Sequence, residues 1–318
     1  MKNVFLTGIT GFIGPILAKK FIEKGYNVYG LVRHSPYRDL ESLSPLLDKI
    51  HLIEGDVRDY HTVASAIRSS LPEVVIHLAA LTPVRLSFVD PFQFIRVNFE
   101  GTANVVHATV ESAPEARLIH ASTGEVYGWL PKDIPVKESA PLHPACPYGV
   151  AKMAADHYVQ MAMKLYGLRA TVLRFFNTYG RREKGFFVEY VISTMLKGDT
   201  VYVGLPHAVR DYMWIDDHIK SYMLSIQKKS AIGQVFNVSP GNPISNIDLA
   251  KKIAKITGFT GEIVEGEYPS GYPTRPATMD PTYIVGDNTK IREVLGWKPS
   301  VSLDEGLKKA VNIFIKAE

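Results

Sequence analysis

The stretch Thr7-Gly8-Ile9-Thr10-Gly11-Phe12-Ile13-Gly14 decides the fold, because it sets three glycines at three-residue spacing between an apolar run and an amphipathic one. Val4–Thr7 has the pattern of a buried strand, and Phe12–Lys24 that of a helix. In such a turn the first glycine permits tight curvature, the second lets backbone N–H groups approach a pyrophosphate, and the third lets the helix pack close to the sheet. Strand, glycine turn and helix in this order predict a dinucleotide-binding unit. An ordinary βα turn is the alternative.

The same alternation continues outward through the first half of the chain. Further apolar runs lack period-two alternation, which indicates strands that are covered on both faces, as in a parallel sheet. Helical patterns separate these runs and predict right-handed crossovers in a doubly wound α/β sheet of the Rossmann type. The predicted strands are Val28–Val32, Lys49–Glu54, Val74–Ala79, Arg117–Ala121 and Arg169–Arg174, and the predicted helices are Tyr60–Ser70, Phe92–Glu111 and Tyr148–Tyr166.

The rhythm changes after Asn177, where segments shorten and Gly and Pro cluster in residues 266–281. We therefore expect residues 1–177 to form the dinucleotide-binding domain and residues 178–318 to form mainly a smaller substrate-binding domain. Residues 211–238 are a candidate segment for a return to the first domain. Helices are predicted at Phe186–Lys197, Asp216–Ile226, Ile247–Thr257 and Leu303–Ile315.

Composition excludes several classes of protein. The 318 residues include 36 Lys+Arg and 32 Asp+Glu, a net charge of +4 that is spread along the chain, which argues against a nucleic-acid partner. The single cysteine, Cys146, rules out an internal disulfide and a cysteine-cluster metal site, and the histidine spacing predicts no metal either. No apolar run reaches the ~20 residues of a membrane helix. With no signal-peptide pattern, we expect a cytoplasmic protein without a membrane partner.

The residue that follows the second predicted strand indicates which nicotinamide cofactor binds. NAD-binding folds usually place Asp or Glu there to bind the ribose 2′-hydroxyl, whereas Arg33 stands in that region here. A cation can bind a 2′-phosphate, so NADP is slightly favoured over NAD, with a solvated loop charge as the alternative. Asp56 and Val57 follow the third strand and are candidates for the adenine, with an ordinary turn aspartate as the alternative.

Tyr148 and Lys152 form a Tyr-x-x-x-Lys pattern, and on a helix these two positions share a face. A cation beside a phenol favours the phenolate, so we expect the pKa of Tyr148 to fall toward neutrality and make it a usable base. The pattern follows a strand that ends in Ser122-Thr123. A surface pair is the alternative.

Together with His77-Leu78-Ala79-Ala80, these motifs resemble the extended short-chain dehydrogenase/reductases over nearly the whole chain. Three further motifs are similar to the nucleotide-sugar branch of that family, of the GDP-mannose 4,6-dehydratase and UDP-glucose 4-epimerase types. They are Arg174-Phe175-Phe176-Asn177-Thr178-Tyr179-Gly180, Val209-Arg210-Asp211-Tyr212 and Leu295-Gly296-Trp297-Lys298-Pro299. The resemblance implies a bound nicotinamide cofactor and a nucleotide-diphosphate sugar as substrate.

The resemblance also implies residue roles. Tyr148 would remove the proton of the sugar C4 hydroxyl while hydride leaves C4, with Thr123 hydrogen-bonded to the same hydroxyl. A helix cap for Asn177 and surface ion pairs for the arginines are the alternatives. A homodimer through Phe92–Glu111 and Tyr148–Tyr166 is implied as well. The implied catalytic residues are Thr123, Glu125, Tyr148 and Lys152; the cofactor contacts are Gly8, Gly11, Phe12, Ile13, Gly14, Arg33, Asp56, Val57, Leu78, Ala79, Ala80, Tyr148 and Lys152; the substrate contacts are Thr82, Thr123, Asn177, Arg210 and Arg275.

The segment Thr123-Gly124-Glu125 bears on which reaction follows. Dehydratases of this family carry Thr-x-Glu, in which Glu takes the C5 proton of a 4-keto sugar, whereas epimerases usually carry a small residue there. Glu125 therefore favours an NDP-hexose 4,6-dehydratase, with a 4-epimerase or an NADPH-dependent 4-keto-6-deoxyhexose reductase as alternatives. Gly124 is a departure, because dehydratases mostly carry Asp or Ser at that position. A structural carboxylate is the alternative for Glu125, and a regulator with an inactive site is the alternative for the protein.

Overall fold

A seven-stranded parallel sheet forms the centre of the molecule in the computed structural model, which describes residues 2–34, 40–130, 134–180, 186–271 and 281–316. The strand order β10-β6-β5-β4-β1-β2-β3 confirms the predicted doubly wound sheet. Chain order reverses between β1 and β4, which is where ligands bind in such sheets, beyond the carboxyl ends of the strands. The strands are β1 (Lys2–Thr7), β2 (Tyr26–Val32), β3 (Ile50–Glu54), β4 (Val74–His77), β5 (Arg117–Thr123), β6 (Ala170–Phe175) and β10 (Gln234–Val238).

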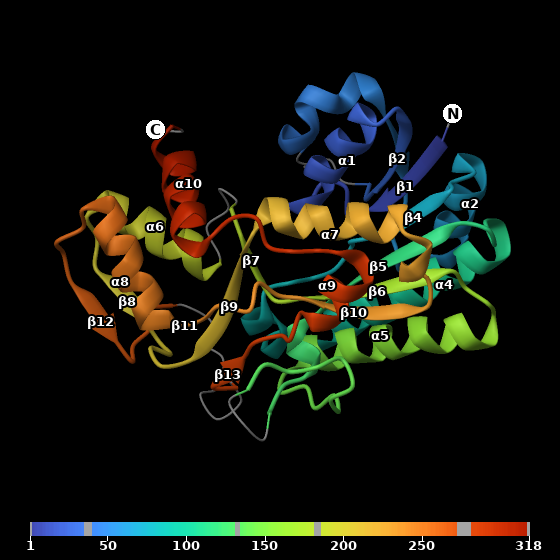
Figure 1. The fold of residues 1–318 in the computed structure, drawn as a ribbon. Coiled ribbons are helices and arrows are strands. Elements are labelled where there is room, and N and C mark those ends of the chain that lie inside the picture. Colours follow the sequence, from blue (N-terminus) through green and yellow to red (C-terminus); the bar gives the residue numbers. More distant parts are fainter. Residues whose placement is uncertain (1, 35–39, 131–133, 181–185, 272–280, 317–318) are drawn as a thin grey trace.

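Helices cover both faces of this sheet (Figure 1). Alternating residues of β1 show the two layers, since Val4 and Leu6 pack with one apolar core while Phe5 packs with the other. Both faces are therefore buried, which explains why the strands read as continuous apolar runs. The helices α1 (Ile13–Glu23) and α7 (Ile215–Gln227) lie on one face, and α2 (Tyr60–Ser70), α4 (Gly101–Ser112) and α5 (Pro147–Leu165) lie on the other.

The chain after Asn177 builds two smaller sheets beside the large one (Figure 1). The central strand β9 pairs parallel with β7 and β13 and antiparallel with β11, and β8 pairs parallel with β12. These strands are β7 (Asn177–Tyr179), β8 (Val201–Val203), β9 (Val209–Trp214), β11 (Pro243–Ser245), β12 (Ile263–Glu265) and β13 (Tyr283–Ile284). The helices α6 (Phe187–Lys197), α8 (Asn246–Thr257) and α10 (Leu303–Ile315) pack together next to them, and α9 (Thr289–Leu295) packs against β10.

The segment expected to return to the first half is divided between the two parts. Residues 211–214 belong to β9 of a smaller sheet, whereas α7 covers the large sheet and β10 extends it beside β6. The division of the chain into domains at residue 177 stays a prediction. Within the described ranges, no helix combines the length and apolar character that crossing a membrane requires.

The predicted helix Phe92–Glu111 is present, but it is not α-helical throughout. A short helix α3 (Pro91–Phe94) passes into a π-helical turn η3 (Ile95–Glu100) before α4 begins. Asn98 of this wide turn is fully buried, and its amide accepts from the Leu81 N–H at 2.7 Å and donates to the Leu81 carbonyl at 2.9 Å. The wide turn thus fixes the loop after β4, in keeping with the placement of many π-turns at functional sites.

Candidate active site

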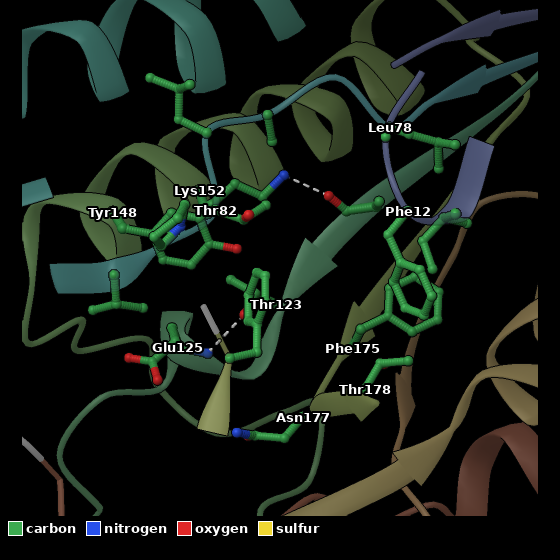
Figure 2. Close-up of a pocket in the computed structure, with 18 of the residues that line it drawn as sticks. Phe12, Leu78, Thr82, Thr123, Glu125, Tyr148, Lys152, Phe175, Asn177 and Thr178 are labelled. Carbon is green, nitrogen blue, oxygen red and sulfur yellow. Dashed lines mark hydrogen bonds between the residues drawn. The ribbon is translucent and has the colours of Figure 1, made fainter. Parts of the chain in front are cut away.

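A cavity of about 720 Å³ lies where the carboxyl ends of β1, β4, β5 and β6 meet the smaller sheets. It coincides with the reversal of strand order, the position expected for a ligand in an open α/β sheet. Figure 2 shows Thr123, Glu125, Tyr148 and Lys152 grouped on one side of it, with Phe12 and Phe175 on the other. The cavity therefore brings residues from both halves of the chain to one place.

The three glycines of the first turn have different surroundings. Gly8 has φ +70°, and a Cβ there would stand 2.7 Å from the Ala79 nitrogen, so the turn needs glycine on both counts. A Cβ on Gly14 would stand 2.4 Å from the Ile9 carbonyl oxygen, and Gly14 is not among the residues that line the cavity. The geometry thus gives Gly14 a packing role, and its assignment as a direct cofactor contact stays a prediction.

The N-terminus of α1 opens into the cavity. Gly11, Phe12 and Ile13 line the wall, and a Cβ added to Gly11 would meet only the Gly8 carbonyl, at 3.3 Å. Phe12 is the N-cap and provides no side-chain cap to the helix. A helix N-terminus presents N–H groups and the positive end of the helix dipole, which together favour an anion. These residues fit the pyrophosphate of a dinucleotide.

The predicted selectivity residues also line the cavity. Arg33 follows β2 and is exposed, while Asp56 and the buried Val57 follow β3. The Asp56 carboxylate pairs with the Arg58 guanidinium at 2.7 Å, and the pKa of Asp56 is lowered mainly by its hydrogen bond to that side chain. Asp56 therefore holds its own turn, and its contact with adenine stays a prediction. Leu78, Ala79 and Ala80 line the cavity after β4, which ends at His77, earlier than expected.

Helix α5 carries the Tyr-x-x-x-Lys pattern on one face, with Pro147 in its first turn. Cys146 is the N-cap, and its sulfur accepts from the Gly149 N–H at 3.3 Å. Tyr148 and Lys152 both line the cavity and are nearly buried. Thr123 lies beside them at the end of β5, where its hydroxyl accepts from the Glu125 N–H at 3.2 Å (Figure 2).

The pKa of Tyr148 departs from expectation. Burial raises it above the ordinary value, the negative charge of Glu125 adds to the rise, and a side-chain hydrogen bond with Thr123 opposes it. The expectation that the neighbouring Lys152 brings the pKa of the phenol toward neutrality is therefore not met in the protein by itself. Burial also lowers the pKa of Lys152 to about 8, against the opposing charge of Asp156. Desolvation penalises both charged forms, because the two side chains share one low-dielectric wall.

Glu125 lies beside this pair, in a short turn (Gly124–Val126) that follows β5. The Cys146 thiol contacts one of its carboxylate oxygens at 3.8 Å. Its neighbour Gly124 has no room for a side chain, because a Cβ there would stand 2.8 Å from the Phe176 ring. The space that a larger residue would use is therefore filled by an aromatic side chain.

The predicted substrate residues lie toward the smaller sheets. Thr82 and Asn177 line the cavity and are exposed, while Arg210 of β9 lines it from a nearly buried position. The Arg210 guanidinium donates to the Val209 carbonyl at 2.9 Å, which holds the side chain close to its own strand. Arg275 lies outside the described residues.

Sequence reasoning missed most of the remaining wall. Asn246 at the start of α8 accepts from the Tyr212 hydroxyl at 2.9 Å and donates to the Leu205 carbonyl at 3.0 Å. Single residues from distant segments carry no spacing signal, although a shared aromatic character could have suggested some of them. Among the described residues, no group of three or more His, Cys, Asp and Glu side chains could hold a metal ion. The missed lining residues include Phe186, Phe187, Tyr190, Tyr202, Leu205, Tyr212, Asn246 and Tyr268.

Comparison with known proteins agrees with this geometry. The sequence matches the GDP-mannose 4,6 dehydratase family over residues 5–310. It is 33% identical to the UDP-glucose 4-epimerase of Mycolicibacterium smegmatis, over 98% of each chain. It is 31% identical to human dTDP-D-glucose 4,6-dehydratase, over 98% of this chain and 89% of that one. The structure of Thermus thermophilus UDP-glucose 4-epimerase in complex with NAD superposes with a TM-score of 0.86, at 28% identity, over 99% of this chain and 100% of that one. The chain therefore belongs to the GDP-mannose 4,6 dehydratase family and is an extended short-chain dehydrogenase/reductase of the epimerase/dehydratase type.

Proposed function

We propose that the protein is an NDP-hexose 4,6-dehydratase that acts through a 4-keto intermediate. The observation that carries this proposal is the position of Glu125, whose carboxylate lines the same wall as Tyr148 and Lys152 and is close enough to influence the phenol. A carboxylate at this place can take a proton that a neighbouring ketone has made acidic. The family and the named relatives include dehydratases.

A nicotinamide cofactor fits the glycine turn and the N-terminus of α1. When bound, it accepts hydride from the sugar and later returns it. Gly8, Gly11, Phe12 and Ile13 would hold its pyrophosphate, and Leu78–Ala80 would flank it. Arg33 at the end of β2 supports NADP over NAD, because a guanidinium can bind a 2′-phosphate.

The first step is removal of the C4 hydroxyl proton by the Tyr148 phenolate. Burial raises the pKa of Tyr148, so the phenol must first release its own proton to solvent to become this base. The Lys152 ammonium and the Thr123 hydroxyl stabilise the phenolate when it forms, so proton transfer depends on both neighbours. Asn177 and Arg210 would bind the diphosphate of the substrate, together with Thr82 and Arg275.

The second step uses Glu125. The ketone at C4 acidifies the C5 proton, and the Glu125 carboxylate removes it and passes it to the departing C6 hydroxyl, which leaves as water. Glu125 then takes up a proton from solvent and delivers it to C5, and hydride from the bound cofactor would return to C6, which yields an NDP-4-keto-6-deoxyhexose. The proton that Tyr148 took from the C4 hydroxyl returns to solvent, so the protons balance. The net reaction is the loss of one water, and the cofactor is recovered in its starting state.

Mass spectrometry tests this proposal directly. The enzyme is incubated with UDP-, GDP-, dTDP- and CDP-hexoses, and one of them should lose the mass of a water. Glu125→Gln should abolish that loss while C4 oxidation continues, and Glu23→Gln, an exposed carboxylate of α1, should behave as the wild type. Loss of water at an unchanged rate in Glu125→Gln would show that the base is another group.

A 4-epimerase is the second candidate, and Gly124 favours it. Phe176 fills the space where a proton donor for the C6 hydroxyl would stand, so Glu125 must act alone in a dehydration. An epimerase needs no such donor, because the 4-keto sugar only rotates in the site to present its other face before hydride returns to C4. An unchanged product mass with a new C4 epimer would establish this activity. Net consumption of NADPH would instead establish a 4-keto-reductase.

The protein is also proposed to be a cytoplasmic homodimer. Val89, Phe92 and Ile95 are apolar and exposed around α3, and Val150 is exposed on the adjoining part of α5. Apolar patches of this kind mark interfaces between proteins. Light scattering should give a dimer that Phe92→Asp weakens and Leu71→Asp, exposed on a distant turn, leaves intact. A monomeric wild type would refute this assembly.

A further inference from the structure

The end of β5 is attached to α5 through side chains that lie along one face of the helix. Tyr148 and Lys152 are four residues apart and thus one turn above the other. The Lys152 ammonium donates to the Ala121 carbonyl (Figure 2), and an interaction with the Thr123 side chain lowers the pKa of Tyr148. The proposed catalytic pair therefore interacts with Ala121 and Thr123, which are two residues apart at the end of β5.

The residue between them makes the third contact, with the next turn of the helix. The Ser122 hydroxyl donates to the Asp156 carboxylate at 2.7 Å, and Asp156 is four residues beyond Lys152. Three consecutive strand residues thus interact with three successive turns of α5, and hydrogen bonds join Ala121 and Ser122 to the helix.

Asp156 is fully buried and fixed from several sides. Arg174 of β6 donates to both of its oxygens, at 2.9 and 3.0 Å, and Gln160 donates at 2.6 Å. Together with Ser122, these donors occupy both oxygens of the carboxylate. The guanidinium is held in turn by the Tyr127 hydroxyl at 2.8 Å, so neither charge of the pair can move independently.

The charges that face Lys152 come from its own helix and from the sheet. Asp156 favours the ammonium form, in opposition to burial. His120 of β5 and His77 of β4 face Lys152 from the sheet, and burial keeps the pKa of each below its ordinary value, so both are neutral. The Arg174 guanidinium pairs with Asp156 and therefore offsets part of the negative charge that Asp156 presents to Lys152. Glu125 and Cys146 act on Tyr148.

We propose that Asp156 is a positioning residue for the Tyr148–Lys152 pair. Anchored by Arg174, its carboxylate holds Ser122 and therefore the end of β5 in register with α5, and it presents a buried negative charge to the Lys152 ammonium. A buried ion pair contributes little to stability compared with apolar residues of the same shape. The contacts of Asp156 instead link the Tyr148–Lys152 pair to β5, the strand that carries Thr123. The catalytic part of this inference rests on the proposed function, whereas the state of Lys152 does not.

Asp156→Asn tests the inference, because asparagine keeps the shape and removes the charge. In protein labelled with ¹³C at lysine Cε, the Lys152 resonance is identified by its loss in Lys152→Met. Its titration midpoint should fall by about one pH unit or more in Asp156→Asn, the size expected for loss of a buried opposite charge. The alkaline limb of the kcat profile should move down equally. Ser122→Ala is the matched control: kcat should fall several-fold through lost register, while the Lys152 midpoint stays at the wild-type value.

A second variant guards against misfolding. Asp156→Asn leaves the buried Arg174 guanidinium without its carboxylate partner, which is strongly destabilising in comparable pairs. Asp156→Asn/Arg174→Gln removes both charges, and the Lys152 midpoint should again fall. An unchanged midpoint in either folded variant would overturn the proposal. Because the resonance needs no substrate, a protein without dehydratase activity could still support the role of Asp156, and the two failures are distinguishable.

Discussion

The two halves of the cavity are built in different ways. The cofactor half is made from main chain at the ends of β1 and β4, where Gly8 and Ala79 approach so closely that a single Cβ would fill the gap. The half that we propose for the nucleotide sugar is made from side chains of separate segments, among them Tyr202, Arg210 and Asn246. A backbone site admits few residue types and is visible in a sequence. A side-chain site can be assembled in many ways and is visible only once the chain is folded.

The largest expected effect lies where the halves meet. Tyr148→Phe removes the hydroxyl that takes the C4 proton, and turnover should fall by roughly 10²–10⁴-fold, the usual contribution of general acid–base catalysis. Cofactor binding, measured by fluorescence titration, should remain. Tyr29→Phe, a half-buried residue of β2 that does not line the cavity, is the control and should keep full activity. Turnover within twofold of the wild type in Tyr148→Phe would remove the phenol from the mechanism.

Gly8→Ala should disrupt the cofactor half, which is made from main chain. The added Cβ would meet the Ala79 nitrogen at 2.7 Å, so the turn must shift and the cofactor should bind at least about tenfold more weakly. Gly25→Ala is matched to it, because Gly25 has φ +76° but open space around its Cβ position. Both variants should lose about 1–2 kcal/mol of stability from the left-handed backbone. Equal cofactor affinity in the two variants would show that the close approach is unimportant.

A substitution in the half proposed for the nucleotide sugar should affect substrate binding and leave cofactor binding unchanged. Asn246→Ala removes hydrogen bonds to Tyr212 and to the Leu205 carbonyl and loosens the wall on the nucleotide side. KM for the nucleotide sugar should rise roughly fivefold, the equivalent of about 1 kcal/mol, while cofactor affinity is unchanged. Steady-state kinetics and a cofactor titration on the same preparation measure both. A change in cofactor affinity instead would show that the halves are not independent.

The smallest effect concerns the stability of the fold as pH changes. The pKa of Lys152 is lowered from 10.5 to about 8 by burial, so the unfolded chain binds more protons than the folded one between these values. Stability due to this residue therefore rises with pH through that window. At pH values below 8, the thermal midpoint of Lys152→Met should be a few degrees higher than that of the wild type. This difference in thermal midpoint should shrink as the pH approaches 10.5. A pH-independent advantage would contradict the buried ammonium.

Much of the fold could be predicted from the sequence, because its determinants are local and repetitive. Helices α2 and α10 have the predicted bounds, and the glycine turn lies between β1 and α1 as expected. The π-turn around Asn98 could not be predicted, since it depends on a hydrogen bond to Leu81 from a distant loop. The rise in the pKa of Tyr148 was missed for a similar reason: burial is a property of the folded wall, whereas the neighbouring lysine is visible in the sequence.

The candidate site divides in the same way. The motif residues Thr123, Tyr148 and Lys152 line one cavity, as spacing and strand order suggested. Asp156 belonged to no motif and Arg174 was noted only as the start of one, so their pairing became visible only when β6 and α5 were placed side by side. Phe176 likewise restricts Gly124 only in the fold. Long-range pairs therefore account for most of what the sequence left undetermined.

The central claim is that Glu125 removes the C5 proton of a 4-keto sugar made by Tyr148. Turnover of the accepted nucleotide hexose in deuterated water tests it most directly, with the product followed by NMR and mass spectrometry. The account predicts a 4-keto-6-deoxyhexose with one deuterium at C5, and no such product from Glu125→Gln. A product that retains its C6 hydroxyl and carries no deuterium at C5 would contradict it.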